Sequence, residues 1–166
     1  EGRVIIATFA SLVDRLIEIV KIAVRHGKKV SLNGRSMKTN FEIAKSLGYL
    51  KEGKEAIIPI EEINKHKDDK VIILTTGAQG EANAGLMRIV NGAHRIVRLK
   101  HNDTVIFSSS VVPGNERSVQ TLQDNIARQV REVYNSKLLD IHASGHANGE
   151  DIKLVLKLIK PKFVVP

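Results

Sequence analysis

The sequence contains no cysteine and no tryptophan, and aromatic residues make up only 4% of its 166 residues. Without cysteine, the chain has no disulfide, no thiol nucleophile and no cysteine-ligated zinc or iron–sulfur site. No apolar run approaches the roughly 20 residues that a membrane helix needs. The first residues also lack the basic and then apolar order of a signal peptide. We therefore expect a cytoplasmic protein that has no membrane partner.

Aliphatic residues dominate what is present. Apolar residues make up 42% of the chain, so with so few aromatics the core must consist of Val, Ile, Leu and Ala. This composition is typical of a buried parallel sheet flanked by helices. A chain of this length can form one sizeable core. The composition therefore predicts an α/β fold.

The charge is strongly positive. The sequence has 26 Lys and Arg residues against 18 Asp and Glu residues, which gives a net charge of +8. Such a charge favours a polyanionic partner such as nucleic acid, although a solvated basic surface would give the same balance. The chain has no aromatic RNA-binding box and no dense Lys/Arg arm.

Hydrophobic patterning predicts alternating strands and helices. Apolar runs predict strands over residues 4–7, 29–32, 71–74, 95–99, 104–107, 137–142 and 162–165. Helical spacing predicts helices over residues 11–27, 36–47, 83–90, 118–133 and 150–159. Ser11 is the expected N-cap of the first helix, and Leu154, Val155 and Leu158 are expected on the buried face of the last.

Five of the apolar runs end in clusters of small, hydroxylated or glycine residues. These clusters are residues 8–11, 33–36, 75–80, 108–110 and 144–146. If the runs are parallel strands, all five clusters gather at the carboxyl edge of one sheet, where open α/β folds bind ligands. Glycine N–H groups, hydroxyls and helix N-termini suit a phosphate. Single clusters of this kind are also ordinary turns and helix caps.

Several other sites can be weighed from the sequence. The loop Gly77–Gly80 lacks the Lys-Ser/Thr of a P-loop, and no G-x-G-x-x-G fingerprint is present. His142 and His146 have zinc-ligand spacing, but Ser144 and Gly145 between them place the pair at a strand end, where the rings do not share a face. A relay of Ser109, His146 and Asp103 lacks the nucleophile elbow. We interpret His146 as functional, and His26, His66, His94 and His101 as surface residues.

In order and spacing, these strings resemble ribonuclease J, in the β-CASP branch of the metallo-β-lactamase superfamily. The resemblance rests on residues 7–11 with Arg15, 34–37, 75–81, 107–110, 113–116 and 144–147. It implies a Rossmann-like, mostly parallel sheet flanked by helices in a β-CASP domain over residues 1–144. Residues 145–166 would begin the return into the metallo-β-lactamase domain. The apolar pattern that stops at residue 165 suggests a piece of a larger protein.

The resemblance implies a zinc-dependent ribonuclease that acts as a 5′-to-3′ exonuclease and an endonuclease in RNA decay and maturation. Two zinc ions would be held by family motifs outside this chain, so we expect no metal in the chain and no activity from it alone. His146 matches the family's catalytic, phosphate-contacting histidine. Ser109, Ser144, Gly145 and His146 match the family pocket for a 5′ phosphate.

The remaining candidate contacts to RNA extend the strand-edge argument. They are Ser11, Arg15, Arg35, Ser36, Gly77 and Gln79. Residues 76–81 resemble a family loop near the RNA channel, although Ala78 stands where the family often has serine. We expect single-stranded RNA as the partner and a monomeric chain, with homo-oligomers open for the whole protein. The alternatives are a non-catalytic nucleic-acid-binding domain and a Rossmann-type nucleotide-binding enzyme, against which the missing glycine fingerprint counts.

Overall fold

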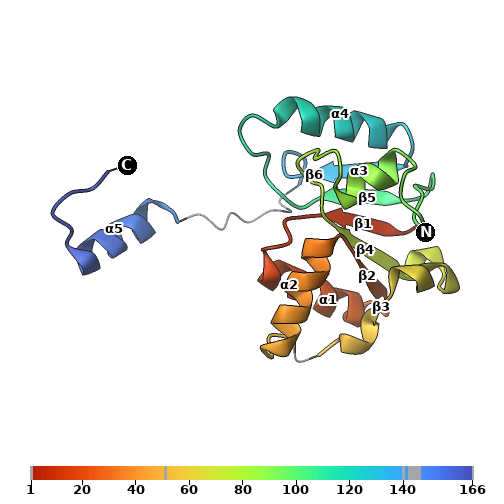
Figure 1. Ribbon diagram of the computed structural model, residues 1–166, viewed down its shortest axis with the longest axis horizontal. Helices are drawn as coiled ribbons and strands as arrows, with labels where there is room; N and C mark the ends of the chain where they lie inside the picture. Colours follow the sequence, from red (N-terminus) through yellow and green to blue (C-terminus); the bar gives the residue numbers. More distant parts are fainter. Residues whose placement is uncertain (1, 51, 140, 142–146, 166) are drawn as a thin grey trace.

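The computed structural model describes residues 2–50, 52–139, 141 and 147–165, and its centre is a six-stranded sheet (Figure 1). The strand order is β3-β2-β4-β1-β5-β6, and every neighbouring pair is parallel. The strands are β1 (Val4–Ala7), β2 (Lys29–Asn33), β3 (Ile57–Ile58), β4 (Val71–Thr75), β5 (Thr104–Phe107) and β6 (Glu132–Asn135). The α/β fold with a parallel sheet is therefore confirmed.

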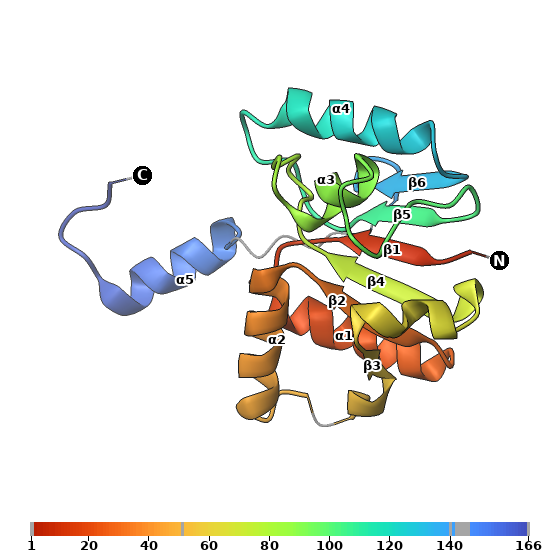
Figure 2. The same ribbon diagram turned by 45° about the vertical axis from the view of Figure 1, so that its right-hand side comes forward.

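Helices cover both faces of this sheet (Figures 1 and 2). The helices are α1 (Val13–Arg25), α2 (Arg35–Ser46), α3 (Gly85–Val90), α4 (Glu116–Ala127) and α5 (Gly149–Ile159), with short 3₁₀ turns at Lys54–Ala56, Ile60–Lys65 and Asp68–Lys70. Because successive side chains of a strand point to opposite faces, Ile5 packs with α3 and α4 while Ile6 packs with α1 and α2. Two aliphatic cores result, one on each face.

A buried ion pair joins the starts of β1 and β5. Arg3 donates from Nε to Asp103 Oδ1 at 2.9 Å and from Nη2 to Asp103 Oδ2 at 2.6 Å. The same Nη2 donates to the carbonyl of Arg98, and the Lys100 N–H donates to Asp103. Asp103 precedes β5 and Ser109 follows it, so the two residues lie at opposite ends of the strand. A relay that includes both is therefore excluded.

Three predicted strands are wrong in the part of the chain that the structure describes. Residues 95–99 form a loop because the ring of His94 accepts the N–H groups of Ile96 and Val97. Residues 137–139 form a turn in which the N–H groups of Leu138 and Leu139 donate to the carbonyl of Asn135. Residues 162–165 form no strand either.

The predicted helix over residues 118–133 is too long. Helix α4 ends at Ala127, and residues 132–135 form the edge strand β6 beside β5. The apolar spacing of Leu122, Ile126 and Val130 continues a helical pattern, but Val130 reaches the same core from a turn. Pairing with β5 therefore overrides the local helical pattern.

Two expectations about helix ends and faces are also wrong. Leu12, not Ser11, is the N-cap of α1, and no side chain caps this helix end; Ser11 is exposed. In α5, Leu154, Val155 and Leu158 are exposed because no described residue covers them, and α5 lies apart from the sheet (Figure 2).

Among the helices of the described ranges, none has the length and the apolar character that a membrane-spanning helix needs.

Candidate functional site

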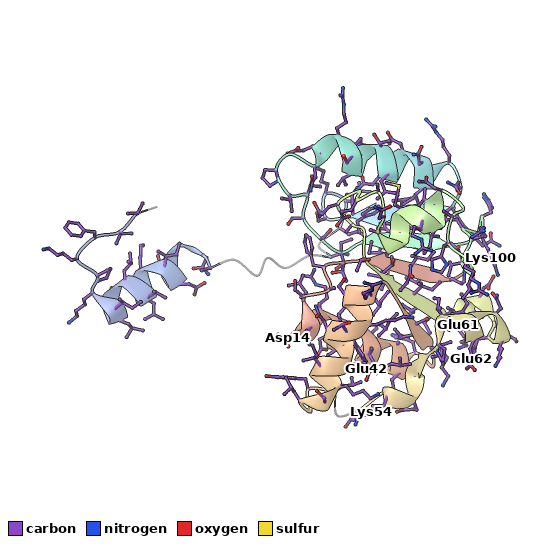
Figure 3. The ribbon with its side chains drawn as sticks, in the orientation of Figure 1. Asp14, Glu42, Lys54, Glu61, Glu62 and Lys100 are labelled. Carbon is purple, nitrogen blue, oxygen red and sulfur yellow. The ribbon has the colours of Figure 1, made fainter. Side chains whose placement is uncertain are left out.

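The carboxyl ends of the central strands lie level with one another. Ala7 is in register with Thr75 and Phe107, and Asn33 is in register with Thr75. The clusters that follow β1, β2, β4 and β5 therefore meet at one edge, as the sequence predicts. Figure 3 shows the two edges: Asp14, in the first turn of α1, lies on the side that faces α5, and Lys100, before β5, lies on the opposite side.

The fifth cluster cannot be placed. Ser144, Gly145 and His146 lie outside the described residues, so their part in the site stays a prediction. The strand expected before them does not form over residues 137–139, and β6 occupies the position beside β5. Ser136 follows β6 at the carboxyl edge.

The chain changes direction between β1 and β5. After β1 it crosses to β2 on one side, and after β5 it crosses to β6 on the other. Open α/β sheets bind ligands in the crevice at such a point. Here Thr8 Oγ1 donates to the carbonyl of Ser108 at 3.0 Å, and Ser108 Oγ donates to the carbonyl of Ile141 at 2.9 Å. The first of these hydrogen bonds joins the ends of β1 and β5, and the second joins the end of β5 to the segment after β6.

Arg15 brings a positive charge to this crevice. It lies in α1, and its Nη1 donates to the carbonyl of Ser108 at 2.7 Å. Partial burial lowers the pKa of the Arg15 guanidinium, although an arginine keeps its charge at neutral pH. The predicted candidate Arg15 therefore lies at the end of β5, within the cluster to which Ser109 belongs.

The loop after β4 is held by Gln79. This residue is buried, and its Nε2 donates to the carbonyl of Ser110 at 2.8 Å while its Oε1 accepts the N–H of Val112 at 2.8 Å. Gly77 has φ +106°, and a Cβ there would lie 2.8 Å from the Cβ of Ala84. Because its side-chain amide is engaged with protein groups, Gln79 positions the loop beside the residues that follow β5.

The candidates after β1 and β2 are open to solvent. Gly34 has φ +110°, and a Cβ there would lie 2.7 Å from Thr76 Oγ1, so only glycine lets the two loops approach. Arg35 and Ser36 begin α2 and are exposed, as is Ser11. These side chains are accessible at the edge but are not tied to the crevice.

A cavity of about 630 Å³ adjoins Ser109. Ser109 is only 5% exposed, and within the described ranges its hydroxyl forms no hydrogen bond. The cavity is lined by Ala78, Phe107, Ser109, Ser110, Val111, Glu116, Arg117, Val119, Gln120, Gln123, Asn135, Ser136 and Lys137. Because the Ser109 hydroxyl has no hydrogen bond to a described residue and is not fully enclosed, it is available to a polar ligand in the cavity.

His94 is buried, although the sequence predicts it at the surface. The ring accepts the N–H groups of Ile96 and Val97 at Nδ1, so Nε2 carries the proton and donates to Asn33 Oδ1 at 3.0 Å. Asn33 Nδ2 donates to Thr75 Oγ1 at 3.0 Å. The available signal was Asn33, since an amide that ends a buried strand needs a buried partner.

The surroundings of His94 favour its neutral form. Burial lowers its pKa, and the positive charges of Arg88, Arg98 and Lys38 lower it further, while Glu61 acts in the opposite direction. The network from His94 to Thr75 lies at the ends of β2 and β4 and connects the loop after α3 to the loop after β4. His94 therefore stabilises the loops at the carboxyl edge of the sheet.

The described residues do not offer a catalytic metal centre. Within the described ranges, no group of three or more His, Asp or Glu side chains could hold a metal ion. Among the described residues, the candidate site consists of hydroxyls, backbone N–H groups and Arg15. Such a set binds anions by hydrogen bonding and charge.

Comparison with known proteins identifies the family. The family model described as "Ribonuclease J, beta-CASP domain" matches residues 1–126. The chain is 39% identical over 166 residues to ribonuclease J of Helicobacter pylori (strain B128), covering all of this chain and 24% of that protein. It is 44% identical over 165 residues to ribonuclease J 1 of Streptococcus pyogenes serotype M3, covering 99% of this chain and 30% of that protein.

A third relative, ribonuclease J of a Synechocystis species, is 40% identical over 166 residues, covering all of this chain and 26% of that protein. The chain therefore spans about a quarter to a third of the length of these relatives. The family match ends at residue 126, and the domain boundary at residue 144 stays a prediction. The resemblance in the sequence is confirmed: this chain belongs to the ribonuclease J β-CASP domain family.

Proposed function

We propose that this chain is the RNA-binding β-CASP part of a metal-dependent ribonuclease that hydrolyses phosphodiester bonds in RNA decay and maturation. The observation that carries the proposal is the set of hydroxyl, glycine and arginine groups in register at the carboxyl edge, in a chain of this family. The net charge of +8 supports single-stranded RNA as the partner. RNA decay by the whole protein would take place in the cytoplasm.

The carboxyl edge of the sheet would bind the 5′ phosphate of the RNA. Ser109 is buried and has an unused hydroxyl, and Arg15 contributes charge at the adjoining residue, Ser108. Ser144, Gly145 and His146 would complete the pocket, with His146 donating to the scissile phosphate as negative charge develops. A neutral donor contributes about 0.5–1.5 kcal/mol and a charged one about 1.5–3 kcal/mol.

In this enzyme class, zinc supplies a hydroxide nucleophile at neutral pH. The described residues do not fit a zinc site, because no suitable cluster of ligands is present among them. We therefore derive no chemical step through the metal, and we expect this chain by itself to be inactive. The residues of this chain would bind and orient the RNA.

The test compares two single-stranded RNAs that differ only in a 5′ phosphate or a 5′ hydroxyl. Fluorescence anisotropy with this chain should show tighter binding of the phosphorylated RNA. Ser109→Ala should reduce that preference by about 2- to 13-fold, the equivalent of one neutral hydrogen bond. Ser46→Ala is the matched control, because Ser46 is exposed at the last residue of α2 and lies away from the candidate site. Equal binding of the two RNAs by the unmodified chain would contradict the proposal.

A further inference from the structure

The cavity beside Ser109 extends well beyond the space that a phosphate needs. Its volume is about 630 Å³, and it lies between the loop after β5, the first two turns of α4 and the turn after β6. Figures 1 and 2 show α4 lying over β5 and β6. Phe107 and Val119 give the cavity an apolar part. A planar group larger than a phosphate could be held there.

Two amide side chains on one face of α4 line the cavity with unused hydrogen-bonding groups. Gln123 Oε1 accepts a hydrogen bond from Asn135 Nδ2 at 3.1 Å, and within the described ranges its NH₂ group has no partner. Gln120 Nε2 donates to Asp124 Oδ1 at 2.8 Å, and its carbonyl oxygen has no partner among the same residues. The cavity wall therefore presents one donor group and one acceptor group, three residues apart on a helix.

The charges around the cavity favour an anion-bearing ligand. Arg117 and Lys137 both line it and both are exposed. The carboxylate of Glu116 also lines it, but its Oε2 accepts the N–H of Gly114 at 2.9 Å. The two cationic side chains outnumber the one carboxylate, which already accepts a hydrogen bond. The net positive charge at the cavity suits the phosphates on either side of a nucleotide.

We infer that this cavity binds one base of the RNA, with its hydrogen-bonding edge toward Gln120 and Gln123 and its ring against the apolar part. A nucleobase has both donors and acceptors on its edge and an apolar face, and proteins recognise unpaired RNA bases by these two features. The inference rests on the proposed function, because the phosphate of the same nucleotide would lie at Ser109.

Amide NMR of the ¹⁵N-labelled chain provides the test. Adenosine, cytidine, guanosine and uridine 5′-monophosphates are titrated separately. Ribose 5-phosphate is the ligand that lacks a base, and the four nucleosides are the ligands that lack a phosphate. At least one nucleotide should bind about fivefold or more tightly than ribose 5-phosphate, since one base contact contributes about 1–3 kcal/mol. Its amide shifts should include Gln120, Gln123 and Asn135.

The variant Gln123→Met keeps the length of the side chain and removes its hydrogen-bonding groups. It should lower the affinity for the preferred nucleotide toward that for ribose 5-phosphate and leave ribose 5-phosphate binding unchanged. Gln129→Met is the matched control, because Gln129 follows the far end of α4 and donates to the carbonyls of Val90 and Asn125. If Gln123→Met unfolds the protein, Gln120→Met makes the same test.

The outcomes separate this inference from the proposed function. Ribose 5-phosphate that binds as tightly as every nucleotide, with shifts at Ser109, overturns the base site and leaves the phosphate site standing. Nucleosides that bind as tightly as nucleotides, with shifts at Gln123, support the base site and overturn the phosphate contact. No binding of nucleotides or of ribose 5-phosphate overturns both.

Discussion

At the scale of single residues, His94 makes the free energy of unfolding depend on pH. The folded protein favours the neutral form of this side chain, because burial and nearby positive charges lower its pKa below the usual value of 6.5. In the unfolded chain His94 takes up a proton as the pH falls through about 6.5. The unfolded state then binds more protons than the folded state, so the free energy of unfolding falls with pH.

We predict that urea unfolding shows this loss of stability between pH 7.5 and pH 5.5. The stabilisation is complete above pH 6.5 and decreases as the pH approaches the lower pKa of the folded state. His94→Gln should be less stable at pH 7.5 but should show a smaller decrease on acidification. His101→Gln is the control, because His101 is exposed. The same pH dependence in His94→Gln and the unmodified protein would be evidence against a neutral buried His94.

Residue patterns predicted the position of some candidate residues in the fold and missed that of others for a physical reason. The position of Ser109 at the carboxyl edge was predictable because it follows a strongly apolar strand. His94 was not recognised as buried because it lies outside the predicted strands and helices, and Asp103 because its sequence neighbours are polar. Their burial depends on Asn33 and Arg3, which lie 61 and 100 residues away in the sequence. Local pattern carries no information on such distant partners.

At the scale of elements, strands buried on both faces were the most predictable. Residues 4–7, 71–74 and 104–107 have continuous apolar runs, and each forms a strand at that position. The edge strand β6 was missed because the side chains of Glu132–Asn135 are only partly buried, so the strand has no continuous apolar run. The sequence correctly predicts the helix α5. It does not show whether another element covers the apolar face of that helix, because this depends on residues elsewhere in the protein.

The ion pair between Arg3 and Asp103 gives a prediction at this scale, because it joins the residues that immediately precede β1 and β5. Asp103→Leu should lower the free energy of unfolding by about 3–5 kcal/mol, since it leaves a buried guanidinium without its partner. The double variant Arg3→Met/Asp103→Leu should recover most of that loss. Denaturant unfolding of the three proteins measures both effects. A double variant no more stable than Asp103→Leu would contradict this account.

At the scale of the whole molecule, the positive charge should make RNA binding depend strongly on salt. The chain carries +8, and the proposed contacts lie along one edge of the sheet. Binding that releases counterions weakens as salt rises, so affinity for single-stranded RNA should fall about tenfold or more between 50 and 200 mM salt. Anisotropy titrations at several salt concentrations give this slope.

A pair of matched variants tests where the RNA lies. Arg35→Gln removes a charge at the carboxyl edge and should reduce the salt slope by about 0.7, the value for one phosphate contact on a single strand. Lys70→Gln removes a charge just before β4, at the opposite edge, and should leave the slope unchanged. Equal effects of both changes, or binding indifferent to salt, would contradict RNA binding at this edge.

The most direct test of the central claim is a crystal structure of this chain bound to a short 5′-phosphorylated single-stranded RNA. The account predicts the 5′ phosphate at the carboxyl edge of the sheet, within hydrogen-bonding distance of Ser109 and close to the end of β5. A phosphate bound at the opposite edge, near Arg3 and Asp103, or on the outer surface of a helix would contradict it.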